Sequence, residues 1–360
     1  MNFLYILLEI WAILTGKKNL NHPKKIGILF LPKLGIGDLI MLSPVIQKIA
    51  DLFPQSEVYL VTWVAPLIDF KNVKVLQPKE VKLAKIKFDF IISPTLTLRH
   101  IPYVFRAQYW LGYFAKPKLQ ANFCIKKYSY SLRGEHYLWR GINLIKVLNQ
   151  EEGDKLERAA IDRAIVYPEL LTKKPSYFDS ALDGFTYLAL APFSKWSAKQ
   201  WPIKWFAEVT EFLLKNGQIR KIVILGDNSE HDRLALARFL EYLPDYIKDK
   251  TINAVGKNTL AETSFIIKNS FLFIGLDSAP AHIAYLTAPR ILAIFIITDP
   301  LNIIALTTNR GRITYLHPSN CPKFPCYSGL AMSDYHQCQI CAQSITVDKV
   351  SKEIQALLNG

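Results

Sequence analysis

IGILFLPKLGIGDLIMLSPVIQKIADLF, residues 26–53, is the stretch that decides the fold class. It begins with a continuous apolar, β-rich run, which is typical of a strand buried on both faces. A turn with two glycines follows, and apolar residues then recur at helical spacing over residues 39–53. A buried strand, a short turn and an amphipathic helix form the opening unit of a parallel α/β sheet.

The same alternation continues along the chain and starts afresh after residues 165–184, which carry two prolines and mixed polarity. Further strands are predicted at residues 58–63, 73–76, 88–94, 185–193, 221–226, 271–277 and 290–296. Further helices are predicted at residues 136–148, 202–216, 230–243 and 279–288. We therefore expect an N-terminal segment (1–22), an α/β domain (23–170), a linker (171–184) and a second α/β domain (185–360).

The positive charge of the chain is concentrated in its first half. The formal net charge is +14, and residues 1–180 hold 26 Lys and Arg against 15 Asp and Glu, a net charge of +11. This asymmetry favours contact of the first domain with an anion or an acidic membrane face. The alternative is a charged surface that only faces solvent.

The N-terminal segment is apolar from Phe3 to Leu14 except for Glu9, and lysines follow it closely. It lacks the basic start and small-residue cleavage site of a signal peptide, and it is shorter than the roughly 20 apolar residues that span a bilayer. An apolar helix with a basic flank suits the headgroup layer of a membrane. The alternative is a helix packed on the protein's own surface.

The turn after the first strand contains Gly35, Gly37 and Asp38. A dinucleotide-binding turn needs a third small residue where this chain has Ile40, and no Gly-Lys-Ser/Thr of a P-loop follows. Asp38 is predicted to be the N-cap of the helix over 39–53. It also lies at the carboxyl edge of the first strand, where α/β sheets bind ligands.

Two later turns carry polar residues between a strand and a helix. In APFSKWSAKQWP (191–202), Ser194 and Lys199 suit a phosphate group, unless the stretch is only a surface loop. In GLDSAPAHIA (275–284), Asp277 and Ser278 either cap the next helix or, with His282, form a phosphate-type site at its N-terminus.

Four of the five cysteines lie within residues 321–341. A distributed disulfide framework is therefore excluded, and a reducing compartment is favoured. The four residues either hold a structural zinc ion, or are free thiols or disulfides. They are Cys321, Cys326, Cys338 and Cys341.

Together these motifs resemble the ADP-heptose:lipopolysaccharide heptosyltransferases, glycosyltransferase family 9. The resemblance covers about residues 25–350 and rests on their order and spacing. The matching stretches are ILFLPKLGIGDLIMLSPVIQKIADLFP, APFSKWSAKQWPIKWFAEV, VILGDNSEHD, LDSAPAHIAYLTAP and ITDP (297–300), and the cysteine tail is similar to that of many members. The resemblance implies a GT-B fold, with two Rossmann-like parallel-sheet domains facing across a cleft.

The resemblance also implies roles for residues of this chain. Asp38, in its Gly35–Gly37 turn, matches the proposed catalytic base. The positions that match donor-binding residues of the family are Ser194, Lys199, Glu230, Asn258, Asp277, Ser278, Ala279 and His282. This chain departs from the family at Ala279, where glycine is usual, and a methyl group there restricts backbone approach to a phosphate.

From the resemblance we expect an inverting, metal-independent glycosyltransferase that uses ADP-heptose and an anionic lipopolysaccharide-core acceptor. No cofactor and no nucleic-acid partner are expected. The enzyme would be cytoplasmic and peripheral on the inner membrane, with the N-terminal helix at the inner leaflet.

Three rival functions remain open from the sequence. The first is a family relative that uses another nucleotide sugar, such as an N-acetylhexosamine donor. The second is a nucleotide-dependent oxidoreductase, which Ile40 disfavours. The third is a non-catalytic protein that binds membranes or nucleic acid through its basic first half.

Overall fold

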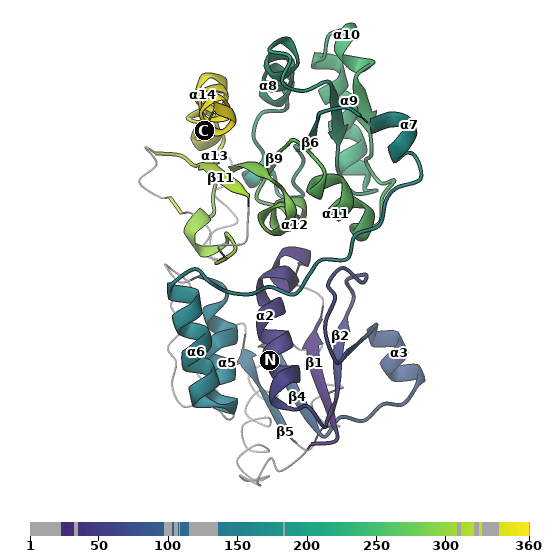
Figure 1. The fold of residues 1–360 in the computed structure, drawn as a ribbon, viewed down its shortest axis with the longest axis vertical. Coiled ribbons are helices and arrows are strands. Elements are labelled where there is room, and N and C mark those ends of the chain that lie inside the picture. Colours follow the sequence, from purple (N-terminus) through teal and green to yellow (C-terminus); the bar gives the residue numbers. More distant parts are fainter. Residues whose placement is uncertain are drawn as a thin grey trace. The chain divides into compact units, whose positions relative to one another are not determined.

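The computed structural model describes residues 23–31, 35–96, 103, 107, 109–114, 136–182, 184–307, 311–319, 324–325 and 338–359. The chain divides into two compact units, Met1–Glu169 and Leu170–Gly360. Each unit is built on its own parallel sheet with helices packed against it (Figure 1). The predicted fold class, two parallel-sheet α/β domains, is confirmed.

The first unit contains a five-stranded sheet in the order β3-β2-β1-β4-β5, with all neighbours parallel. Its strands are β1 (Lys25–Phe30), β2 (Glu57–Thr62), β3 (Val73–Leu76), β4 (Phe90–Leu96) and β5 (Tyr109–Phe114). Its helices are α2 (Ile36–Leu52), α3 (Pro78–Leu83), α5 (Trp139–Leu148) and α6 (Gln150–Ile161). In β1 every residue after the first is buried, which explains why the strand is a continuous apolar run.

Helix α2 packs closely on α5 at one glycine. A Cβ atom added at Gly141 would lie 2.3 Å from Val45 Cγ2, so the missing side chain lets the two helices approach. Helices α5 and α6 form an antiparallel pair that two ion pairs of Lys146 reinforce, 2.7 Å to Glu157 and 3.2 Å to Asp154. Helix α2 therefore packs directly on α5, which itself contacts β4 of the sheet.

The second unit contains a six-stranded parallel sheet in the order β11-β10-β9-β6-β7-β8. Its strands are β6 (Tyr187–Ala191), β7 (Lys221–Ile224), β8 (Thr251–Asn253), β9 (Leu272–Leu276), β10 (Arg290–Ile294) and β11 (Arg312–Leu316). Its longer helices are α8 (Ile203–Lys215), α9 (Glu230–Tyr242), α11 (Leu260–Lys268), α12 (Ala279–Thr287) and α14 (Val347–Asn359). Shorter elements are α7 (Phe178–Leu182), α10 (Asp245–Lys248), α13 (Cys338–Gln343) and the 3-10 turns η2 (Ser197–Lys199) and η3 (Pro300–Asn302).

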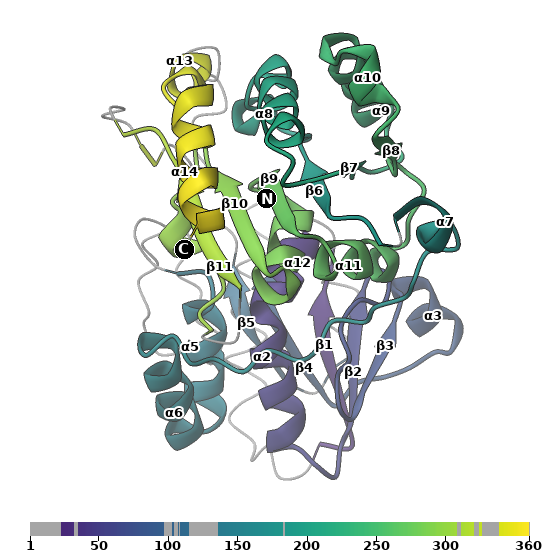
Figure 2. The same ribbon diagram turned by 45° about the horizontal axis from the view of Figure 1, so that its top comes forward.

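Alternate side chains of β6 point to opposite faces of the sheet and contact different helices. Leu188 and Leu190 join the core cluster that also contains residues of α8, α9 and α14. Tyr187 points to the other face, where its hydroxyl donates to the Ile266 carbonyl of α11 at 2.7 Å. Figure 2 shows α14 alongside β10 and β11, which it contacts.

A fully buried tryptophan joins the loop after β6 to the C-terminal segment. Trp201 packs edge-on against Phe206, with ring centroids 4.8 Å apart, and its Nε1 donates to the Ile345 carbonyl at 2.8 Å. The indole therefore fixes the loop that carries Lys199 to a segment 144 residues further along the chain.

Several elements were not predicted from the sequence, among them β5, α6, α11 and α14. The apolar residues Val350, Ile354 and Leu357 of α14 follow helical spacing and would have revealed this helix. Within the described part of the chain, no helix has the length and apolar character needed to cross a membrane. The predicted N-terminal apolar helix (1–22) lies outside the described residues.

Candidate functional site

In the first unit, Asp38 lies in the first turn of α2 but is not its N-cap. The helix begins at Ile36 with Gly35 as N-cap, so the prediction of an N-cap at Asp38 is wrong. Asp38 Oδ2 instead accepts a hydrogen bond from the Gly35 backbone N–H at 2.6 Å. This is half of a capping box, since glycine has no side chain to return the bond. The helix N-terminus also favours a negative charge at this position.

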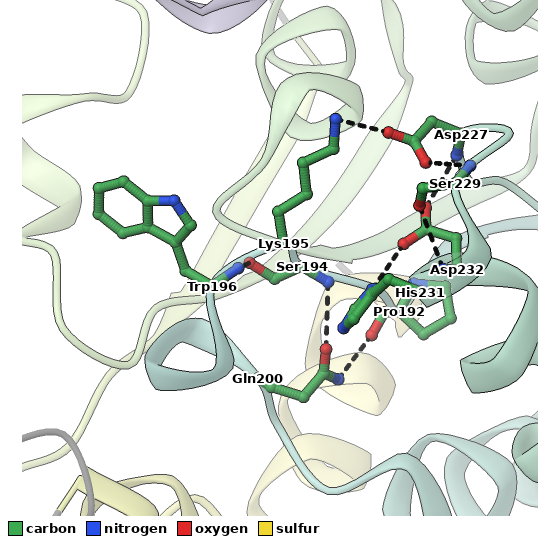
Figure 3. Close-up of polar contacts among 9 residues, drawn as sticks. All are labelled: Pro192, Ser194, Lys195, Trp196, Gln200, Asp227, Ser229, His231 and Asp232. Atoms are coloured by element: carbon green, nitrogen blue, oxygen red, sulfur yellow. Dashed lines mark hydrogen bonds and ion pairs between the residues drawn. The ribbon is translucent and has the colours of Figure 1, made fainter. Parts of the chain in front are cut away.

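In the second unit, a glutamine organises the loop after β6. The Ser194 N–H donates to Gln200 Oε1 at 3.1 Å, and Gln200 Nε2 donates to the Pro192 carbonyl at 2.8 Å (Figure 3). Gln200 Nε2 also donates to the Trp201 carbonyl at 2.8 Å. Ser194 Oγ accepts from the Trp196 N–H at 3.3 Å. The side chain of Gln200 thus closes the loop, and Lys199 directly precedes it.

The loop after β7 is held by two aspartates. Asp227 Oδ2 pairs with Lys195 Nζ at 2.7 Å, and its Oδ1 accepts from the Ser229 N–H at 2.9 Å (Figure 3). Burial opposes the charge of Asp227, but the hydrogen bonds from Lys195 and Ser229 outweigh it and lower its pKa to about 2. Buried Asp232 accepts from the Asp227 N–H at 2.8 Å. The pair Lys195–Asp227 therefore ties the loop after β6 to the loop after β7.

Glu230 and Asn258 each follow one of two neighbouring strands, β7 and β8, by a few residues. Glu230 is exposed in the first turn of α9, after β7. Asn258 follows β8, and its Oδ1 accepts from the Tyr177 hydroxyl at 3.0 Å. Gly256 has a φ of +69°, and a Cβ atom there would lie 2.8 Å from Asn228 Oδ1. Only glycine fits where these two loops approach.

Lys199 of η2 and Asp277, which follows β9, form an ion pair in which Asp277 is buried and Lys199 is partly buried. Lys199 Nζ lies 2.5 Å from Asp277 Oδ2, which also accepts from the Thr298 hydroxyl at 2.7 Å. His282 Nε2 lies 3.8 Å from the other oxygen, Oδ1. Burial opposes ionisation of Asp277, but Lys199, His282 and the two hydrogen bonds hold its pKa below the usual range. The carboxylate is therefore charged at neutral pH.

Ser278 is the N-cap residue of α12, although its side chain does not cap the helix. Its hydroxyl donates to the Leu276 carbonyl at 3.3 Å. Ala279 is the first residue of the helix, and Pro280 occupies the first turn as expected. The Ser278 hydroxyl therefore makes no capping hydrogen bond to α12, and a helix N-terminus attracts anions.

The structure brings the predicted donor-binding residues to one edge of the second sheet. Ser194, Lys199, Glu230, Asn258, Asp277, Ser278, Ala279 and His282 follow the strands β6, β7, β8 and β9, which are neighbours in the sheet. Since all four are parallel, their carboxyl ends lie together. A lysine, hydroxyl groups and a helix N-terminus at such an edge suit a phosphorylated ligand. Gly35, Gly37 and Asp38 belong to the first unit.

The cysteines do not yield a metal site in the described part of the chain. Cys321 and Cys326 lie outside the described residues, Cys338 begins α13, and Cys341 is partly buried. Among the described residues no group of three or more His, Cys, Asp and Glu could hold a metal ion. A structural zinc ion at the four cysteines stays a prediction.

Four polar residues of this edge received no role from the sequence: Lys195, Gln200, Asp232 and Thr298. Asp232 has a local signal, because it stands three residues after Ser229, as in a capping box. Thr298 lies in the quoted ITDP stretch. Lys195 and Gln200 act through contacts that spacing alone does not predict.

Comparison with known proteins identifies one family. The model of glycosyltransferase family 9 (heptosyltransferase) matches residues 83–328. No curated protein matches the chain.

Solved structures of similar fold include a family 9 glycosyltransferase from Veillonella parvula, 18% identical, with a TM-score of 0.64 over 93% of this chain and 97% of that one. ADP-heptose lipopolysaccharide heptosyltransferase II from E. coli is 15% identical, with a TM-score of 0.67 over 93% and 98%. The iron-containing dodecameric glycosyltransferase TibC from enterotoxigenic E. coli is 14% identical, with a TM-score of 0.59 over 96% and 81%. At these identities the likeness shows the fold.

Proposed function

Because this chain belongs to glycosyltransferase family 9, the heptosyltransferase family, and is therefore a glycosyltransferase, we propose that it transfers a heptose from ADP-heptose. The acceptor is a hydroxyl group of an anionic lipopolysaccharide core. One displacement at the anomeric carbon inverts its configuration.

The observation that carries the proposal is the group of polar residues around Lys199. Its ammonium group lies 2.5 Å from Asp277 Oδ2, and Ser194 and the N-terminus of α12 belong to the same sheet edge. A nucleotide diphosphate needs a cation and N–H or O–H donors in one place, and this edge supplies them.

Lys199 and the N-terminus of α12 would stabilise the negative charge that develops on the leaving diphosphate. A protein cation and a helix dipole can do this without a divalent ion, so we propose a metal-independent reaction. Activity is then expected to persist in excess EDTA, and loss of activity that Mg²⁺ restores would contradict this point.

Asp38 is the proposed general base. Its carboxylate lies at the start of α2, beyond the carboxyl end of β1, where parallel sheets present reactive groups. It would take the proton of the acceptor hydroxyl as the oxygen attacks the anomeric carbon.

The identity of the sugar is the finer part of the proposal. Ala279, the first residue of α12, stands where the resembling family usually has glycine, and a methyl group there would restrict the approach of a phosphate to this helix N-terminus. A relative that uses a different nucleotide sugar is the alternative. Comparing the affinities of the protein for different nucleotide sugars distinguishes ADP-heptose from another donor.

We also propose that the enzyme is peripheral on the cytoplasmic face of the inner membrane. The apolar run Phe3–Leu14, the lysines after it and the net charge of +11 in residues 1–180 support this. The full-length protein should sediment with anionic vesicles and be released by high salt. Equal sedimentation with zwitterionic vesicles would argue against the electrostatic part.

Calorimetric titration tests the proposed donor. ADP, UDP, GDP and their sugar conjugates are titrated into the wild type, Lys199→Ala and the control Lys204→Ala. Lys204 is exposed on α8 and lies 3.9 Å from Glu208. We expect ADP-heptose to bind most tightly, Lys199→Ala to weaken it by about 10- to 100-fold through loss of a charge-assisted contact, and Lys204→Ala to match the wild type.

Other outcomes have clear meanings. Preference for a uridine or guanosine sugar would keep the transferase and discard the heptose. An equal loss in Lys199→Ala and Lys204→Ala would show that only net charge matters. No binding of any nucleotide would overturn the proposal.

A further inference from the structure

Thr298 is a buried polar residue that the proposed reaction does not yet use. It follows β10 and is 7% exposed. Buried hydroxyl groups nearly always have a hydrogen-bond partner. The partner here is Asp277 Oδ2, at 2.7 Å, from a loop 21 residues earlier in the chain.

The contact arises from the topology of the sheet. Strands β9 and β10 are parallel neighbours, with Leu276 opposite Ile294. Their carboxyl ends therefore place the loops that follow them side by side. The Asp277 N–H also donates to the Ile294 carbonyl at 3.3 Å, which fixes the backbone of the aspartate.

The side chain of Asp277 is fixed through one oxygen. Oδ2 accepts from both Thr298 and Lys199, whereas Oδ1 lies 3.8 Å from His282 Nε2. Thr298 thus holds the carboxylate in the orientation in which Oδ2 meets the ammonium group of Lys199. Without the hydroxyl, the carboxylate would be freer to rotate about its χ2 angle. Of its two contacts with Asp277, the ammonium group would then keep the longer one, 3.5 Å to the carbonyl oxygen, and its place would be less defined.

We propose that Thr298 is a positioning residue for Lys199, acting through Asp277. It would hold the ammonium group at the end of β9, where the donor diphosphate is proposed to bind. This inference rests on the proposed function, because it assigns Lys199 to the diphosphate. Thr298 itself would not touch the substrate.

The groups around Asp277 indicate that the Thr298 hydroxyl orients this carboxylate and is not needed to keep it ionised. It is faced by Lys199 from η2, by His282 and Tyr285 from α12 and by Thr298. Burial, and then the nearby charge of Asp277, raise the pKa of Tyr285 well above its usual value, so this tyrosine stays neutral. Lys199 and His282 remain beside the carboxylate when the hydroxyl is removed.

The test compares hydroxyl-bearing and hydroxyl-free side chains. Thr298→Val keeps the shape and loses the hydroxyl, Thr298→Ser keeps the hydroxyl, and Thr298→Ala is a second hydroxyl-free variant. Thr210→Val is the matched control. Thr210 is a fully buried threonine of α8, and its hydroxyl has no hydrogen-bond partner among the described residues.

We measure ADP binding by calorimetry and kcat/KM with the nucleotide sugar. Thr298→Val should lose roughly tenfold in both, because the ammonium group of Lys199 is then no longer held in place for its charge-assisted contact with the diphosphate. Thr298→Ser and Thr210→Val should stay close to the wild type. In the Lys199→Ala background, Thr298→Val should cause no further loss.

Three results would overturn the inference. They are wild-type binding by Thr298→Val and Thr298→Ala, failure of Thr298→Ser to retain binding, and a full additional loss in the Lys199→Ala background. The last result would mean that the hydroxyl acts independently of the lysine.

Failure of the proposed function is recognised separately, because the wild type then binds no nucleotide. The inference is in that case judged by denaturant unfolding of Thr298→Val, Lys199→Ala and the double variant. We expect the two destabilisations to be less than additive, since both act on Asp277. Additive losses would overturn the inference without reference to any ligand.

Discussion

The turn that begins α2 and the loops at the edge of the second sheet hold their carboxylates in different ways. Asp38 accepts from the Gly35 N–H, three residues away, and this contact forms within a single turn. Asp277 meets Lys199 and Thr298, which lie 78 and 21 residues away. A local turn can hold one carboxylate by itself, whereas the contacts of Asp277 need several loops that the sheet brings together.

The largest effect is expected at the local turn. Asp38→Asn should lower kcat by about 10²- to 10⁴-fold, because the amide cannot accept the proton of the acceptor hydroxyl. Its Oδ1 can still accept from the Gly35 N–H, so the fold should persist. Turnover and ADP affinity are measured together, and affinity should be unchanged.

The control for this prediction lies on the same helix. Asp51 is exposed near the end of α2 and accepts a hydrogen bond from Gln47. Asp51→Asn should turn over like the wild type. Weak ADP binding by Asp38→Asn would show that this turn also contributes to binding of the donor. The proposed division of roles between the two regions would then be wrong.

The next effect concerns the scaffold behind the second region. Trp201→Ala should destabilise the protein by about 3–5 kcal/mol, because it leaves a large cavity and removes the hydrogen bond to Ile345. Trp201→Phe should cost less, since it keeps an aromatic ring. Denaturant unfolding monitored by circular dichroism gives these values.

Trp196 provides the comparison for Trp201 in the same loop. It is 41% exposed, so Trp196→Ala should change stability little. If Trp196→Ala and Trp201→Ala lowered the free energy of unfolding equally, the packing of Trp201 against the C-terminal segment would not be what stabilises this loop.

The smallest effect is expected at the ion pair between two loops of the second region. The pKa of Asp227 is about 2 in the folded protein, below the usual value of 3.8 for an aspartate. As pH falls, the unfolded chain takes up the proton first. The stabilisation by Asp227 is therefore full above pH 4, declines between about pH 4 and pH 2, and is absent below.

Thermal unfolding of Asp227→Asn and the wild type across this range tests the pH dependence. Because the carboxylate is 42% exposed, we expect a difference below about 1 kcal/mol at pH 7. The difference should shrink as the pH falls toward 2. A constant difference would show that the loss does not depend on the charge of Asp227, and the ion pair with Lys195 would then contribute no stability.

Most strands of both sheets could be predicted from the sequence because parallel strands are continuous apolar runs. The strand over 73–76 and the helix starts at 230 and 279 agree with the structure to the residue. Strand β5 was missed because its stretch, YWLGYF, lies in an aromatic and basic region without clear periodicity. The start of α2 was placed three residues late because an aspartate after two glycines resembles an N-cap.

The sequence by itself determined the α/β class, the two successive sheets and the motifs that place the chain in its family. These depend on hydrophobic periodicity and on turn residues, which act over a few positions. The tertiary structure decided that Asp277 Oδ2 is shared by Lys199 and Thr298 and that Lys195 pairs with Asp227. Such contacts follow from which strands are neighbours in the sheet, and the order of strands is not written in any local pattern.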